Sequence, residues 1–239
     1  VNMSPLAWLG LGLGMAAYAL ATFWGWHLGP KLQQRPWVRS QLLLLTCGIW
    51  LELVFFDLLP STQPTLMGIL GFRMATLFSL ILFFTPVILM SGLHSFVGWA
   101  PSGRLRLGAF TLQNMLEGVL IYSLCRVNPW LGTAYLFLTA PHALVEAMTI
   151  RELSRPAKAG TYKRQVLGNL AGLGLGCVLI EGMGSLISLA VFNQLMAGYL
   201  FYVAFVDLYQ EVVRQAKRPI IPYAVFLGMG LMGLLNVLV

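Results

Sequence analysis

The chain has 239 residues, of which 58% are apolar and 10% are charged, and its mean hydropathy is +0.79. Soluble domains carry about 25% charged residues, so this composition excludes an ordinary soluble protein and indicates a single membrane domain over residues 1–239. The net charge of +7 comes without a basic face interleaved with aromatic residues, so nucleic acid is not an expected partner. We expect a multi-pass protein surrounded by lipids, in the inner membrane of a bacterium or another plasma membrane.

Apolar runs long enough to cross about 30 Å of hydrocarbon as helices recur along the chain. They cover residues 5–26, 41–59, 65–90, 107–125, 130–150, 166–192, 195–212 and 220–238. This pattern predicts an all-α protein with eight transmembrane helices. Of the 15 bases, 13 lie in the connections after odd-numbered runs. The positive-inside rule therefore places these connections, including the loop at about 151–165, in the cytoplasm and both termini outside.

The fourth run carries three polar side chains within one helical turn. Gln113 and Asn114 precede Glu117 by four and three residues, so a helix presents all three on nearly one face. A carboxylate at this depth costs about 3 kcal/mol on insertion scales and persists when it has a partner. A carboxylate beside two amide oxygens suits a cation.

The fifth and sixth runs add further ionisable groups at a similar depth. His142 and Glu146 are four residues apart and share a helical face, and Glu181 lies within the sixth run. Each residue alone has a plainer interpretation, such as a hydrogen-bonded core histidine or a protonated carboxyl group. Clustered carboxylates would repel one another without a cation, so the set predicts a cation site.

Four other acids lie nearer the ends of their runs. Asp57, with Glu52 five residues deeper, lies in the second run, and Asp207 and Glu211 lie in the seventh. We expect Glu52 and Asp57 to line an outer route to the site, and Asp207 and Glu211 an inner one.

Several stretches, in order along the chain, resemble motifs of the ZIP (Zrt/Irt-like) family of divalent-metal transporters. Residues 113–118 (QNMLEG) resemble the fourth-span motif H-N-x-P-E-G, and residues 142–147 (HALVEA) resemble the fifth-span H-D/E-x-P-E-G. Residues 181–184 (EGMG) are similar to T-E-P-L-G in the sixth span, and 57–60 (DLLP) to H-L-L-P-E in the second. Residues 198–208 (GYLFYVAFVDL) follow the seventh-span pattern A-G-x-F-L-Y-V-A-x-V-D-L.

The resemblance implies a ZIP-like bundle of eight spans with a metal site between the fourth, fifth and sixth. The implied ligands are Asn114, Glu117, His142, Glu146 and Glu181. The chain departs from the family motifs at five positions. Family ligands are replaced by Gln113 and Ala143, a family His by Asp57, and motif prolines by Leu116 and Val145. We therefore expect one metal site in place of the family's binuclear site. One imidazole, several oxygens and no thiolate favour Mn²⁺ or Fe²⁺ alongside Zn²⁺.

The expected function is therefore a secondary carrier, and not an enzyme, that moves a divalent transition metal ion toward the cytoplasm. Zn²⁺, Fe²⁺ and Mn²⁺ are the candidate substrates, with Cd²⁺ as a further one, and a homodimer is left open. Rocking of one helix group against another would give alternating access. Two alternatives stay open: a non-transporting metal sensor or scaffold of the same fold, and an intramembrane metallohydrolase whose H-x-x-x-E pair holds a metal-activated water.

Overall fold

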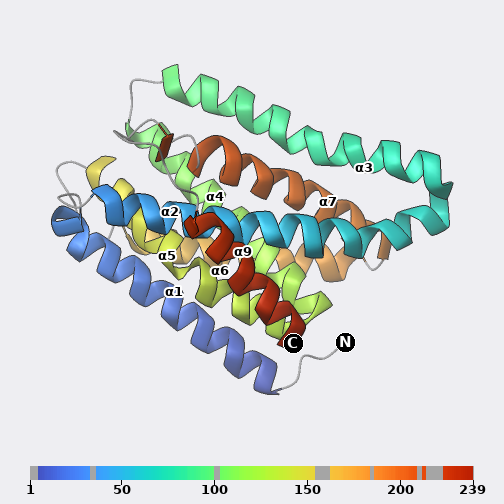
Figure 1. Ribbon diagram of the computed structural model, residues 1–239, viewed down its shortest axis with the longest axis horizontal. Coiled ribbons are helices and arrows are strands. Elements are labelled where there is room, and N and C mark those ends of the chain that lie inside the picture. Colours follow the sequence, from blue (N-terminus) through green and yellow to red (C-terminus); the bar gives the residue numbers. More distant parts are fainter. Residues whose placement is uncertain are drawn as a thin grey trace.

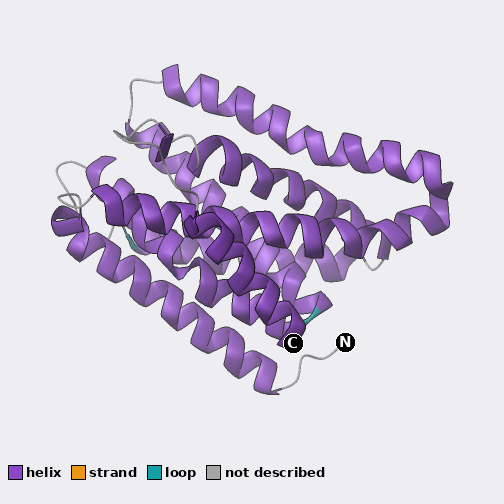
Figure 2. Ribbon diagram, in the orientation of Figure 1, coloured by secondary structure: helices purple, strands orange, loops and turns teal. Residues whose placement is uncertain are grey.

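The computed structural model describes residues 5–32, 36–99, 103–153, 162–183, 186–208, 212–213 and 223–238. All regular secondary structure in these ranges is helical (Figure 2), which confirms the all-α prediction. The elements are α1 (Pro5–Leu32), α2 (Pro36–Glu52), the π-helix η1 (Leu53–Leu58), α3 (Leu59–Trp99), α4 (Gly103–Val127), α5 (Pro129–Leu153), α6 (Lys163–Met183), α7 (Leu186–Tyr202), the π-helix η2 (Val203–Leu208) and α9 (Tyr223–Leu238).

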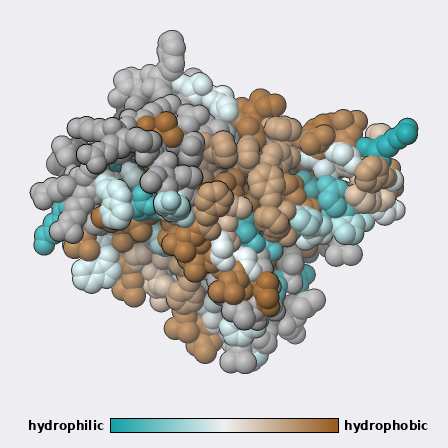
Figure 3. Space-filling model, viewed as in Figure 1, coloured by the Kyte–Doolittle hydropathy of each residue, from teal (hydrophilic) through white to brown (hydrophobic). Residues whose placement is uncertain are grey.

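Within the described residues, four helical stretches are long and apolar enough to cross a membrane. They are Trp8–Lys31, Trp37–Leu93, Lys163–Gly182 and Ile187–Phe205. Helices α4 and α5 have 25 residues each, but they carry the polar residues of the predicted site, which lower their hydropathy. Large apolar side chains are exposed along α3 and α9 (Figure 3), as expected for surfaces that face lipid.

The second and third predicted runs form one helical stretch that reverses later than predicted. The predicted break at residues 60–64 is wrong, because the helix continues through Pro64 and departs from helical geometry only at Gly71. Figure 1 shows the chain turning back there and α3 returning along the bundle. With φ 72° and ψ 163°, Gly71 occupies a backbone region that is essentially restricted to glycine.

This backbone requirement gives a first prediction. Replacing Gly71 with alanine is expected to destabilise the protein by about 1–3 kcal/mol, because the new Cβ would be strained at this φ and ψ. Gly68→Ala is the matched control, since a Cβ at either position meets no atom within 4 Å and alanine is the better helix former. Unfolding in detergent should show Gly71→Ala destabilised and Gly68→Ala at or above wild type. Equal stability of the two variants would contradict the requirement.

The sixth and seventh runs are also divided differently from the prediction. The break falls between α6 and α7, which begins at Leu186, and not at residues 193–194 as predicted. Asn193 and Gln194 are instead buried within α7. Their side chains are hydrogen-bonded to Ser123 of α4 and Thr62 of α3, so polarity here marks helix contacts and not a loop.

The helices pack as two groups. In the first helix group α1 lies along α5, and α4 packs against both α5 and α6; in the second, α2 lies along α9 and α3 along α7. The main contact between the groups is between α2 and α5. The candidate site lies in the first helix group.

Helices α2 and α7 repeat one local structure. Both pass into a six-residue π-helix, LVFFDL in η1 and VAFVDL in η2. The matching residues are each 150 positions apart: Gly48 and Gly198, Phe55 and Phe205, Asp57 and Asp207, and Leu58 and Leu208. The two helices run in opposite directions (Figure 1), so the second helix group contains an inverted structural repeat.

Candidate functional site

Helices α4 and α6 run in parallel at very short range, and this fixes which side chains meet. A Cβ added at Gly172 would lie 2.0 Å from the Met115 carbonyl oxygen, and one at Gly118 would lie 2.2 Å from the backbone carbonyl oxygen of Asn169. Glycines allow helix backbones to approach this closely. The resulting register places the start of α6 beside the middle of α4.

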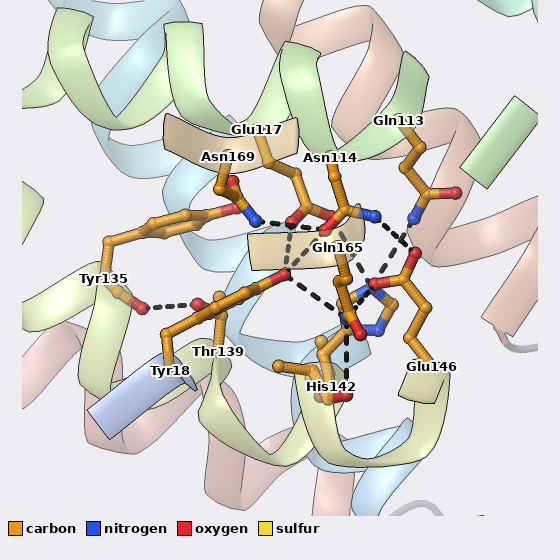
Figure 4. A network of polar contacts seen from close by, with 12 residues as sticks. Tyr18, Gln113, Asn114, Glu117, Tyr135, Thr139, His142, Glu146, Gln165 and Asn169 are labelled. Atoms are coloured by element: carbon orange, nitrogen blue, oxygen red, sulfur yellow. Dashed lines mark hydrogen bonds and ion pairs between the residues drawn. The ribbon is translucent and has the colours of Figure 1, made fainter. Parts of the chain in front are cut away.

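Asn114 of α4 is the centre of the resulting polar network (Figure 4). Its Oδ1 accepts hydrogen bonds from the Tyr18 hydroxyl at 2.9 Å and from Asn169 Nδ2 at 3.0 Å. Its Nδ2 donates to Glu146 Oε1 at 2.7 Å. One amide therefore joins α1, α4, α5 and α6. We use the term polar cluster for the following residues: Tyr18, Gln113, Asn114, Glu117, His142, Glu146, Gln165 and Asn169.

Glu146 is held from both sides by amide donors. In addition to Asn114, Gln165 Nε2 donates to Glu146 Oε2 at 2.5 Å, and the same nitrogen lies 3.3 Å from the Ala143 carbonyl oxygen. Glu117 Oε2 lies 3.3 Å from the same Tyr18 hydroxyl and shares its single hydrogen with Asn114 Oδ1. Both carboxylates and His142 are at most 4% exposed, so the charges of this site lie in the interior of the first helix group.

The imidazole of His142 lies between the two carboxylates. Its Nε2 is 3.5 Å from Glu117 Oε1 and 3.9 Å from Glu146 Oε2, and Gln113 Nε2 lies 3.5 Å away on another side. The indole of Trp50 on α2 packs edge-on against the ring, with centroids 4.6 Å apart. Trp50 thus brings the second helix group into contact with the polar cluster.

Some buried oxygens of the polar cluster have no hydrogen-bond donor among the described residues. Three buried oxygens receive no hydrogen bond from any described residue: Glu117 Oε1, Gln165 Oε1 and Asn169 Oδ1. A buried acceptor without a donor costs about 1–3 kcal/mol, and more when it is charged. The site is therefore electrostatically incomplete without a proton, a water molecule or a cation.

Glu181 does not join the other predicted ligands. Its Oε1 accepts from the Tyr122 hydroxyl at 2.8 Å and lies 2.7 Å from Arg126 Nε, and the side chain is 45% exposed. It follows Asn169 by twelve residues on the same helix, which corresponds to about 18 Å of rise. The expectation that Glu181 lies at the depth of Glu117 is therefore corrected.

The structure brings together five of the six predicted ligands: Gln113, Asn114, Glu117, His142 and Glu146. The predicted route acids lie elsewhere. Glu52 is buried in α2 and lies close to α9. A Cβ added at Gly233 of α9 would lie 3.6 Å from Glu52 Oε1. Asp57 is half-buried in η1. Asp207 belongs to η2, but its side chain lies outside the description, and Glu211 lies outside the described residues.

Sequence reasoning missed Tyr18, Gln165, Asn169 and Trp50. Gln165 and Asn169 are four residues apart and share a helical face, which was a usable signal. Ligands were predicted only at charged residues, at histidines and at amides within a turn of Glu117, and the amides near the start of the sixth run fall in none of these classes. Tyr18 and Trp50 lie in apolar runs that contain other aromatic residues. Nothing in the sequence distinguishes these two as contacts of a polar site.

Among the residues that the structure describes, no three His, Cys, Asp or Glu side chains stand ready to hold one metal ion. Binding by the polar cluster would therefore need amide oxygens or a shift of a carboxylate. Neither a protein-family model nor a curated protein matches this chain. The resemblance to the ZIP family consequently stays a prediction based on its motifs.

Proposed function

We propose that the protein is a ZIP-like secondary carrier that moves a divalent transition metal ion toward the cytoplasm through the polar cluster. The observation that supports this most directly is the group of buried oxygens without a hydrogen-bond donor around two carboxylates and one imidazole. Glu117 and Glu146 together match the charge of a 2+ ion. A bound ion would thus offset both the electrostatic repulsion and the missing donors.

The spacing of the ionisable groups is compatible with shared ion binding. His142 Nε2 and Glu117 Oε1 are 3.5 Å apart, which exceeds the usual N–H···O hydrogen bond of about 2.7–3.2 Å. Two ligand atoms that each lie about 2.1 Å from one ion in tetrahedral geometry are about 3.4 Å apart. Glu146 Oε2 is 3.9 Å from the same nitrogen, so a small shift of this carboxylate would complete the set.

The proposal includes eight spans with both termini outside. The described helices supply eight segments when the helical stretch from α2 to α3 is divided at Gly71. Alternating access would be a movement of the first helix group, which holds the polar cluster, against the second. Zn²⁺, Fe²⁺ and Mn²⁺ are the proposed substrates. The ion would pass acids that line its route, outside the site at Glu52 and Asp57 and on the inner side at Asp207 and Glu211.

Uptake by the purified wild-type protein in proteoliposomes tests the proposal. We expect saturable uptake of at least one of Mn²⁺, Fe²⁺ and Zn²⁺ into sealed vesicles, together with binding of that ion by the detergent-solubilised protein. Protein-free vesicles give the background leak. If none of the three ions is bound or taken up, the proposal is wrong.

A second candidate function is a non-transporting metal sensor or scaffold. It is favoured by the hydrogen bonds that Asn114 and Gln165 donate to Glu146, because such donors can fix α4, α5 and α6 together without a substrate. Ion binding without uptake of any of the three ions would support this reading over the carrier.

A further inference from the structure

We infer that Gln165 of α6 is an ion ligand through its side-chain oxygen. On this helix the motif resemblance had implied Glu181 as the ligand. The inference rests on the proposed ion-binding function and specifies its ligand set. With Gln165 the first ligands would be two carboxylates, one imidazole and a neutral amide oxygen. The charge of the site is then −2 and not −3.

The orientation of the Gln165 amide is fixed by its neighbours. One end of the amide lies 2.5 Å from Glu146 Oε2, and because an ionised carboxylate oxygen only accepts, that end must be the NH₂ group. The same group lies 3.3 Å from the Ala143 carbonyl oxygen, which also accepts. The other end is therefore the oxygen Oε1, which is buried and receives no hydrogen bond from the described residues.

The position of the side chain agrees with this role. In Figure 4 Gln165 extends into the middle of the polar cluster, between Tyr18 and Glu146. Gln165 is 1% exposed, so bulk solvent does not reach its side-chain oxygen. A cation shared with Glu146 and His142 would satisfy this oxygen.

The other two amides near Gln165 have different partners. Asn114 Oδ1 already accepts from Tyr18 and Asn169, so ion binding there would cost at least one of these bonds. Asn169 Oδ1 also receives no hydrogen bond from the described residues, but the Asn169 NH₂ group binds the Asn114 amide oxygen and not a carboxylate. Asn169 is therefore a positioning residue, which orients Asn114 so that its NH₂ group donates to Glu146.

A neutral oxygen in place of a third carboxylate also bears on ion selectivity. Mn²⁺ favours a larger set of oxygen ligands, whereas Zn²⁺ is satisfied by four ligands that include nitrogen or sulfur. Loss of the Gln165 oxygen should therefore weaken Mn²⁺ binding more than Zn²⁺ binding. The ratio of the two affinities is a readout that a purely structural role of Gln165 would leave unchanged.

Three variants separate a ligand from a hydrogen-bond donor. Gln165→Met removes both the oxygen and the NH₂ group, whereas Gln165→Glu keeps an oxygen and removes the donor to Glu146. Gln194→Met is the matched control, because Gln194 is also fully buried and donates to Thr62 in the second helix group. Binding is measured on the purified full chain in detergent, with Mn²⁺ followed by its electron paramagnetic resonance signal and Zn²⁺ by competition.

We expect Gln165→Met to weaken Mn²⁺ binding by about 100-fold or more, because it removes a ligand oxygen as well as the donor that orients Glu146, and loss of an orienting group alone costs about 10–100-fold. Zn²⁺ binding should weaken less, and Gln194→Met should bind both ions as wild type does. Gln165→Glu should bind Mn²⁺ at least as tightly as wild type, and its thermal stability should depend more strongly on added Mn²⁺. If Gln165→Glu loses binding as Gln165→Met does, Gln165 acts only as a donor to Glu146 and the inference is wrong.

Failure of the inference is distinguishable from failure of the proposed function. If wild type binds Mn²⁺ or Zn²⁺ and Gln165→Met binds equally well, the proposed function stands and the assignment of Gln165 is overturned. If wild type binds neither ion, both are overturned. A melting curve for each variant without ions shows whether loss of binding reflects loss of the fold.

Discussion

Glu117→Gln is expected to abolish saturable ion uptake and to weaken binding of Mn²⁺ and Zn²⁺ by about 100-fold or more. Removal of groups that only orient a metal ligand typically costs about 10–100-fold in affinity, and Glu117 is proposed to touch the ion itself. The change removes one of the two negative charges of the polar cluster. A single carboxylate would then remain to balance a 2+ ion in a buried site.

The same substitution should leave the ion-free protein at least as stable as wild type. The glutamine oxygen can still accept from Tyr18, which lies 3.3 Å from Glu117 Oε2, and a buried charge is removed. A structural role for Glu117 predicts the reverse, with lower stability and an unchanged affinity among molecules that fold. Thermal unfolding without ions, measured beside the binding titration, separates these two roles.

Glu181→Gln is the matched control for this experiment. It makes the same chemical change in the neighbouring helix α6, where Glu181 is paired with Arg126 and partly exposed. Exposed ion pairs contribute about 0–1 kcal/mol, so both stability and ion affinity should stay close to wild type. If Glu181→Gln abolishes binding while Glu117→Gln does not, the structure-based site is wrong and the sequence-based ligand is restored.

The sequence predicted the helical fold and most of the candidate site because both follow from local patterns. Apolar runs specify helices, and the spacings from Gln113 to Glu117 and from His142 to Glu146 place their side chains on single faces. These faces meet across α4 and α5 in the structure. Prediction therefore succeeded where the relevant partners are a turn apart or lie on consecutive helices.

The errors arise where tertiary contacts override local signals. Polar residues within α7 were read as a break between spans, but Asn193 is satisfied by Ser123 on another helix. Glu181 was placed in the site because its depth was counted from a run whose end was misplaced. The register between α4 and α6, which pairs Asn169 with Asn114, is set by close glycine contacts that no single helix reveals.

These glycine contacts lead to the largest expected effect on the fold. Gly172→Ala should lower stability by about 3 kcal/mol or more, because its Cβ would lie 2.0 Å from the Met115 carbonyl oxygen and the obstacle is backbone, which cannot change rotamer. Helices α4 and α6 would have to separate by about 1 Å to restore a tolerable contact. Gly174→Ala is the control on the same helix, since its Cβ would meet no atom within 4 Å.

The separation should also reach the polar cluster. Asn169 donates to Asn114 across the same helix contact at 3.0 Å, so moving α6 away would break this bond and release the amide that holds Glu146. We therefore expect Gly172→Ala to lose ion affinity even under conditions where it remains folded, whereas Gly174→Ala retains both. Thermal unfolding and Mn²⁺ titration of the two variants test this coupling. Retained affinity in a folded Gly172→Ala protein would mean that the helix register does not position the site.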